Sequence, residues 1–230
     1  MRLDKFLADN SDFSRAEVKR LMHKERVTVN GEVVKDPGFK LGEADQVCLD
    51  DEPMRAMGNR YLMLHKPKGY VCSTDDPEHA SVLMLLEDRD RFGLHMAGRL
   101  DLDTTGLVLL TDDGQWSHKV TSPKHDCPKR YRVWLADPLV EDAEARFQEG
   151  VQLRGERHLT KPAQLERIDA CEVLLTISEG KYHQVKRMFA ALDNKVVDLH
   201  REAIGPLELD PALAEGEYRP LTDAEIAALS

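Results

Sequence analysis

One short loop carries the residues best suited to chemistry. It spans residues 98–106, is rich in Gly, Asp and Thr, and precedes an apolar run. Such a loop can hold one carboxylate at a sheet edge while its glycines let the backbone approach a ligand closely. Asp101 and Asp103 are the carboxylates in question, although turn capping is the commoner role of such residues. The glycine spacing matches neither a Walker loop nor a dinucleotide-binding fingerprint, so neither nucleotide site is predicted.

Two other segments place polar groups on elements that are predicted to be regular. Tyr131 follows Lys129 at the start of a predicted strand, where core packing alone would also explain an aromatic residue. Lys186 and Arg187 lie in a predicted helix over His183–Leu192, whose apolar residues recur at helical spacing. His183 has no second histidine four residues on, so it is interpreted as a structural or RNA-contacting residue and not as a metal ligand.

The net charge of −10 argues at first against a polyanionic partner. The charge is segregated, however. Residues 14–26, 117–132 and 180–201 are each net basic, whereas residues 202–230 hold seven acidic residues and one arginine. This pattern predicts a basic working face on an acidic body. The residues expected to contact phosphate or RNA are Arg15, Lys19, Arg20, Lys66, Lys68, Arg99, Lys129 and His183.

Composition excludes several classes of protein. No apolar run approaches the roughly 20 residues that a membrane helix needs, and no signal peptide is recognisable. The four cysteines form no Cys-x-x-Cys pair, so neither a zinc knuckle nor a disulfide framework is predicted. We expect a cytoplasmic, metal-free protein, and a monomer because no exposed apolar stripe calls for a partner.

The elements that must position these residues form two predicted units. In the first, Leu3, Phe6 and Leu7 recur at helical spacing, Ser14–Glu17 is a capping box, and the Asn-Gly pair within residues 27–34 predicts a hairpin. Residues 50–60 break every periodicity and are interpreted as a linker. We therefore expect an RNA-docking domain with its linker over residues 1–58 and a larger domain over residues 59–230.

In the larger domain the predicted strands outnumber the helices and follow no regular βαβ rhythm. The strands are predicted at residues 61–64, 107–111, 131–135 and 173–177, and the helices at 141–149, 183–192 and from Thr222. This order favours an α+β fold with a mixed, mainly antiparallel sheet.

A family resemblance joins these segments. The run from Gly98 through Asp101 to Gly114 resembles the aspartate motif of the pseudouridine synthases, Lys129–Tyr131 resembles their Lys-x-Tyr strand, and residues 179–188 resemble their basic third motif. Residues 2–7, 14–15 and 29–31 are similar to the S4 RNA-binding domain. Residues 66–77 are similar to the branch of the family that acts on small-subunit ribosomal RNA, which implies that RNA as the partner and its uridine 516 as the target.

The resemblance implies specific roles. Asp101 would be the catalytic carboxylate, acting as a nucleophile or as a base on the ribose. Lys186 or Arg187 would keep it ionised, since many relatives have arginine where Lys186 stands and either cation could contact it. Tyr131 would stack on the uracil, and no cofactor would be needed because the reaction involves no net redox change or hydrolysis.

Two alternatives stay open at this point. A non-catalytic RNA-binding or ribosome-assembly protein would use the basic helix and have no need of Asp101. A carboxylate-dependent N-glycosidase would release the base and would need a second carboxylate, for which Asp103 is available, to activate water.

Overall fold

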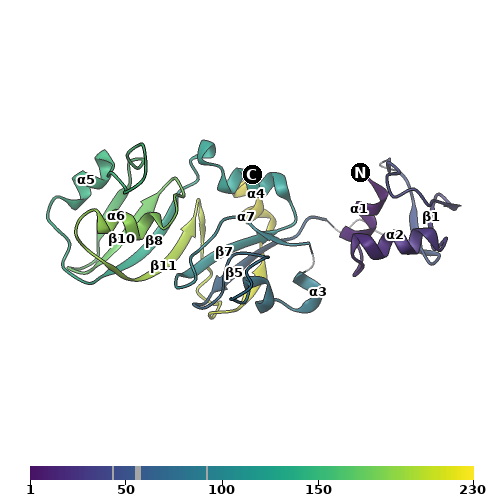
Figure 1. The fold of residues 1–230 in the computed structure, drawn as a ribbon, viewed down its shortest axis with the longest axis horizontal. Helices are drawn as coiled ribbons and strands as arrows, with labels where there is room; N and C mark the ends of the chain where they lie inside the picture. The colour runs from purple at the N-terminus through teal and green to yellow at the C-terminus, as the bar shows by residue number, and fades with distance from the viewer. Residues whose placement is uncertain (43, 55–57, 92) are drawn as a thin grey trace. The chain divides into compact units, whose positions relative to one another are not determined.

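The computed structural model describes residues 1–42, 44–54, 58–91 and 93–230, apart from the side chain at position 89. The chain divides into two compact units, Met1–Asn59 and Arg60–Ser230, next to the expected boundary between residues 58 and 59. Figure 1 gives the element labels used below. Each unit is described by itself.

The first unit packs two helices on a small antiparallel sheet. Its elements are α1 (Leu3–Asp9), α2 (Arg15–His23), β1 (Val27–Val29), β2 (Glu32–Val33), β3 (Val47–Leu49) and β4 (Glu52–Met54), with strand order β2-β1-β3-β4. The predicted capping box is confirmed, because the Ser14 side chain accepts from the amide of Glu17 and Glu17 reaches back to the Ser14 amide. The predicted hairpin is also confirmed, with Asn30 and Gly31 at positive φ in its turn.

The linker prediction is partly wrong. Glu52–Met54 forms strand β4 and pairs with β3, after a turn in which Asp50 and Asp51 both adopt positive φ. Two adjacent aspartates tolerate this turn geometry, which local periodicity does not reveal. The rest of the predicted linker includes residues 55–57, which lie outside the described residues.

The second unit is built on one large sheet with strand order β13-β5-β7-β11-β8-β10-β9. Its strands are β5 (Tyr61–Lys66), β6 (His95–Met96), β7 (Thr105–Thr111), β8 (Lys129–Leu135), β9 (Gln164–Arg167), β10 (Glu172–Ile177), β11 (Val196–Ile204), β12 (Leu207–Glu208) and β13 (Tyr218–Pro220). All its pairings are antiparallel except that of β7 with β11. The predicted α+β class with a mainly antiparallel sheet is thereby confirmed.

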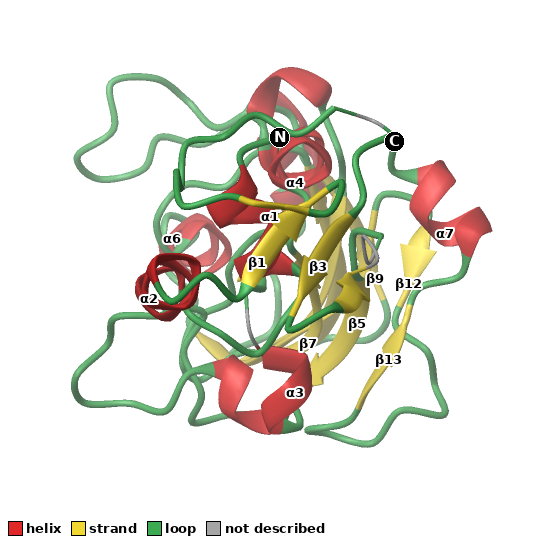
Figure 2. Ribbon diagram, turned by 90° about the vertical axis from the view of Figure 1, so that its right-hand side faces the viewer, coloured by secondary structure: helices red, strands yellow, loops and turns green. Residues whose placement is uncertain are grey.

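Helices cover the two halves of this sheet differently (Figures 1 and 2). The helical segments are η1 (Val82–Leu85), α3 (Asp88–Arg91), α4 (Gly114–Thr121), η2 (Pro123–His125), α5 (Ala143–Glu149), α6 (Gln184–Ala190) and α7 (Asp223–Ala228). Apolar residues of α5 and α6 join those of β8 and β10 in the main core. A second core lies where α4 and α7 pack on β5 and β7, and Figure 2 shows α7 beside β12 and β13. The other face of the β8 half is instead charged.

The parallel contact between β7 and β11 positions the aspartate loop. Gly106, at the start of β7, is paired with Arg201 of β11. A Cβ atom on Gly106 would lie 2.3 Å from the Arg201 carbonyl oxygen, and φ is +112° there, so this approach requires glycine. The loop that ends at Gly106 is therefore held against the middle of the sheet.

Candidate active site

The backbone of the aspartate loop is tied down on both sides of Asp101. The ammonium of Lys66 donates to the carbonyls of Thr104, at 2.7 Å, and Leu102, at 3.4 Å. The Gly69 amide also donates to the Leu102 carbonyl. Because these bonds fix the chain immediately after Asp101, its carboxylate has little freedom to move.

Lys66 is therefore placed as a support of the loop and not on the surface, where an RNA contact was expected. The residue is fully buried, and burial lowers the pKa of its ammonium. A sequence signal for this was available, since Leu62, Leu64 and Lys66 alternate along β5 and so share its core-facing side.

Arg201 ties the other end of the loop to the tyrosine strand. Its guanidinium donates to the Leu107 carbonyl at 2.8 Å, to the Arg99 carbonyl at 3.2 Å and to the Tyr131 hydroxyl at 3.4 Å. The residue is 3% exposed, and within the described part of the chain its Nη2 has no partner. Burying a cation with an unused donor costs free energy. The prediction from sequence missed it, although Leu199, Arg201 and Ala203 alternate on the buried side of β11.

The Asp101 carboxylate faces two groups from one turn-and-helix segment. Lys186 Nζ lies 3.5 Å from Oδ2 and His183 Nε2 lies 3.5 Å from Oδ1, while 30% of the Asp101 side chain is exposed. Lys186 thus places a positive charge beside Asp101, and the exposed part of the carboxylate leaves access for a substrate. His183 was expected to contact RNA, and its place beside Asp101 was not foreseen.

Lys186 is shared with the second carboxylate of the loop. Its ammonium donates to Asp103 Oδ1 at 2.6 Å, and this bond holds the pKa of Asp103 below its usual value. Asp103 is exposed and ionised, so it serves as a tether for the lysine. Of the two carboxylates, it is Asp101 that also faces the imidazole.

Of the two candidate cations, Lys186 is the one that lies beside Asp101. Arg187 donates to Glu156 Oε1 at 3.2 Å and to the carbonyls of Tyr182 and Arg154. These bonds fasten the segment before α6 to the loop around Glu156. Arg187 is therefore placed as a brace, and its expected contact with Asp101 is not formed.

Tyr131 and Lys129 lie on β8, two residues apart, in different environments. Tyr131 is 9% exposed and belongs to the main core, with its hydroxyl beside Arg201. Lys129 is half-buried and donates to the carbonyls of Val120 and Cys127, and burial lowers the pKa of its ammonium. An RNA contact by Lys129 is thus not supported, since its donors already hold backbone carbonyls together.

The remaining basic residues are accessible. Arg15, Lys19 and Arg20 are exposed on α2 of the first unit, and Arg99 is exposed in the aspartate loop. Lys68 is also exposed and pairs with Asp198 at 3.0 Å. These positions can meet a phosphate backbone without rearrangement of the core.

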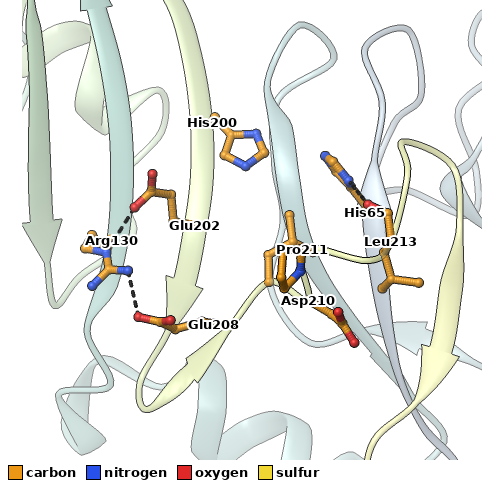
Figure 3. A pocket seen from close by; sticks show the side chains of 9 residues that line it. His65, Arg130, His200, Glu202, Glu208, Asp210, Pro211 and Leu213 are labelled. Carbon is orange, nitrogen blue, oxygen red and sulfur yellow. Dashed lines mark hydrogen bonds and ion pairs between the residues drawn. The ribbon is translucent and has the colours of Figure 1, made fainter.

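A separate cavity lies on the opposite face of the sheet (Figure 3). It has a volume of about 330 Å³ and includes His65, His200, Glu202 and Arg130 in its lining. Successive strand residues point to opposite faces, so His200 and Glu202 face away from Arg201. No cluster of three or more metal-ligating side chains occurs in the described part of the chain, and none of its helices is long and apolar enough to cross a membrane.

Comparisons with known proteins identify the family of each unit. Residues 60–191 match the RNA pseudouridylate synthase family and residues 1–47 match the S4 domain. The chain belongs to the pseudouridine synthase family, and is thus an isomerase acting on RNA.

Individual relatives carry more specific names than the family does. The chain is 58% identical to the ribosomal small subunit pseudouridine synthase A of Yersinia pestis, over all of this chain and 98% of that one. It is 57% identical to the enzyme of the same name from Escherichia coli K12, over the full length of both. A crystal structure of a pseudouridylate synthase matches over both whole chains, with a TM-score of 0.74 and 52% identity.

Proposed function

We propose that this protein converts one uridine of small-subunit ribosomal RNA, uridine 516, to pseudouridine, with Asp101 as its catalytic carboxylate. The observation that carries the proposal is the Asp101 side chain, part exposed in an anchored loop and faced by Lys186 and His183. The names of its full-length relatives support the choice of RNA.

The chemistry fits the groups present. The reaction breaks the bond between uracil N1 and ribose C1′, turns the base and joins C5 to C1′, and the proton on C5 is finally transferred to solvent while N1 gains one. An ionised Asp101 acts as the nucleophile or as the base on the ribose, and its charge stabilises cationic character at C1′. Lys186, 3.5 Å from Asp101 Oδ2, orients the carboxylate. Tyr131, whose hydroxyl lies beside Arg201, contacts the uracil ring in this proposal.

The target base must leave its stack to reach Asp101. Bases in folded RNA are accessible to side chains mainly where they can be splayed out of the helix. Arg99 and Lys68 are exposed. The Arg99 carbonyl is bonded to Arg201, and Lys68 precedes Gly69, whose amide is bonded to Leu102. We assign both side chains to the phosphates of the extruded strand. In this proposal Lys66 and Lys129 support the fold from within.

The first unit supplies affinity through the basic side of α2. Arg15, Lys19 and Arg20 contact phosphates and release counterions, so RNA binding weakens as salt rises. Replacing all three by glutamine lowers the slope of log affinity against log salt by about 0.7–0.9 for each phosphate that is no longer neutralised. The control is the triple variant's conversion rate at saturating RNA, which stays near that of wild type.

The test uses small-subunit RNA, naked and partly assembled with ribosomal proteins. After incubation with the protein, pseudouridine is mapped by carbodiimide-dependent stops of reverse transcription, with large-subunit RNA as the control. We expect one new stop, at uridine 516. A stop elsewhere in the small-subunit RNA would contradict the target, and no stop on any substrate would contradict the proposal as a whole.

The same reaction mixtures test the two alternatives. Free uracil in the supernatant would indicate N-glycosidase activity, in which Asp103 activates water. Tight RNA binding without product, by wild type as well as by Asp101→Asn, would indicate an assembly factor. The ion pair of Asp103 with Lys186 disfavours the first, since that carboxylate is already engaged.

A further inference from the structure

Tyr182 has the most exposed large apolar side chain in the described part of the chain. Its exposure is 76%, and the other large exposed side chains there are aliphatic. Within the described residues its hydroxyl has no hydrogen-bond partner. Single exposed apolar residues are common on protein surfaces and need no explanation by themselves. The residues around Tyr182 distinguish it from other exposed apolar residues.

The ring of Tyr182 stacks on His183, which in turn lies beside the Asp101 carboxylate. It lies on the His183 ring with centroids 3.8 Å apart and planes inclined by 19°. His183 in turn places Nε2 3.5 Å from Asp101 Oδ1. The outer face of Tyr182 is thus separated from Asp101 by one imidazole ring and faces solvent.

The backbone under this stack is held in one conformation. The Tyr182 carbonyl accepts from Arg187 at 2.9 Å, and the Lys181 amide donates to the side chain of the buried Gln184 at 2.8 Å. His183 has a φ of +46°, which is uncommon for a residue other than glycine and persists only where its surroundings hold it. The two rings are therefore presented as a fixed surface, with little ordering needed when a ligand binds.

Flat aromatic faces beside an RNA-modifying site suit one class of ligand. Nucleobases stack on tyrosine and histidine rings, and RNA-binding proteins reach these bases most easily where the bases are not stacked on their neighbours. Extrusion of a uridine leaves the adjacent base without one stacking partner. A preformed ring at the rim of the site can take that partner's place.

We infer that Tyr182, supported by His183, forms a stacking subsite for the nucleobase next to the target uridine. This inference rests on the proposed function and adds a specificity-determining contact to it. The occupant is the neighbouring base and not the target, because the His183 ring stands between Tyr182 and Asp101. The nucleotide in contact with Asp101 is therefore one ring removed from the outer face of Tyr182.

The test measures binding and conversion with three variants at one position. Tyr182→Ala removes the ring, Tyr182→Phe keeps the ring without the hydroxyl, and Tyr182→Leu keeps apolar area without a flat face. Stacking of one base disappears only when the aromatic face is removed. We expect affinity for the small-subunit substrate to fall about tenfold for Ala and Leu and to stay within about twofold for Phe.

A fluorescent base locates the contact. The substrate carries 2-aminopurine on either side of the target, and binding is followed with Asp101→Asn as the background so that no product forms. The fluorescence of one flanking position changes on binding, and the change disappears with Tyr182→Ala. Ile168→Ala, an exposed residue next to the edge strand β9, is the matched control and leaves both readouts unchanged.

The outcomes separate this inference from the proposed function. Equal affinity of Tyr182→Ala and wild type, or an equal loss for Phe and Ala, would overturn the stacking subsite while conversion by wild type continued. A fluorescence change at neither flanking base would also overturn it. Failure of wild type to convert any uridine contradicts the proposed function instead.

Discussion

The two faces of the catalytic sheet differ in how their charges are used. On one face, Asp101 is part exposed and directed toward Lys186 and His183, and the loop around it is fixed by Lys66 and Arg201. On the other face lies a cavity whose lining includes His65 and His200 (Figure 3). There the charged side chains satisfy one another, in a ladder that runs Glu172, Arg132, Glu202, Arg130, Glu208.

The difference shows that a cavity in this sheet does not coincide with the anchored carboxylate that is suited to catalysis. A nucleotide that is flipped out of its stack has to reach the catalytic carboxylate, and the Asp101 side chain is 30% exposed at the end of an anchored loop. The charges on the opposite face are instead paired with one another along β8, β10, β11 and β12. The predictions below test whether the two faces divide catalysis and stability in this way.

The largest effect is expected from Asp101→Asn. The substitution keeps the size of the side chain and removes its charge, so conversion falls by about 10³-fold or more while RNA affinity stays within a few-fold of wild type. Single-turnover conversion and filter binding measure the two quantities. Glu202→Gln on the other face is the control, with normal conversion per folded molecule. A parallel loss of RNA binding in Asp101→Asn would mean that the residue is chiefly structural.

Lys186→Gln follows, with Arg187→Gln as its neighbour in sequence. Loss of the cation that faces Asp101 lowers the single-turnover rate by about 10²-fold. Arg187→Gln acts through the Glu156 brace and lowers the rate by about tenfold or less, with a measurable fall in melting temperature. If the two variants exchanged these effects, Arg187 would be the cation that matters in the RNA-bound protein.

Arg201→Lys tests whether the buried Arg201 acts on the site through Tyr131. Lysine keeps the charge but cannot bond to the Arg99 carbonyl, the Leu107 carbonyl and Tyr131 together, so the rate falls by about tenfold at unchanged RNA affinity. A double-mutant cycle with Tyr131→Phe checks that the two residues act as a unit, because their effects are then less than additive. Fully additive effects would show that Arg201 supports the fold and does not act through Tyr131.

The smallest effect on activity is expected from His200→Gln in the cavity. Burial and the neighbouring His65 lower the pKa of His200 below its ordinary value of 6.5. The unfolded chain therefore binds this proton more readily, and His200 makes the fold less stable as the pH falls below about 6.5. The variant shows conversion within about twofold of wild type and a flatter dependence of Tm on pH over that range. A large loss of conversion would contradict the assignment of catalysis to the face that carries Asp101.

Much of the fold could be predicted because local patterns carried it. The capping boxes at Ser14 and Thr222 and the Asn30-Gly31 turn all form as the sequence indicates. The central strand β11 was missed because the buried Arg201 interrupts the apolar pattern along its core-facing side. Strand β4 was missed because a strand of three residues between turns has no periodicity to detect.

The sequence by itself determined the elements with strong local signals, the aspartate loop and its family, because each depends on neighbours along the chain. Only the tertiary structure decided which cation faces Asp101. Successive helical residues point about 100° apart, so Lys186 and Arg187 cannot both face it, and the packing of α6 on the sheet selects Lys186. The same holds for Lys66 and Arg201, whose charges are buried to hold the loop through bonds to residues about 40 and 100 positions away.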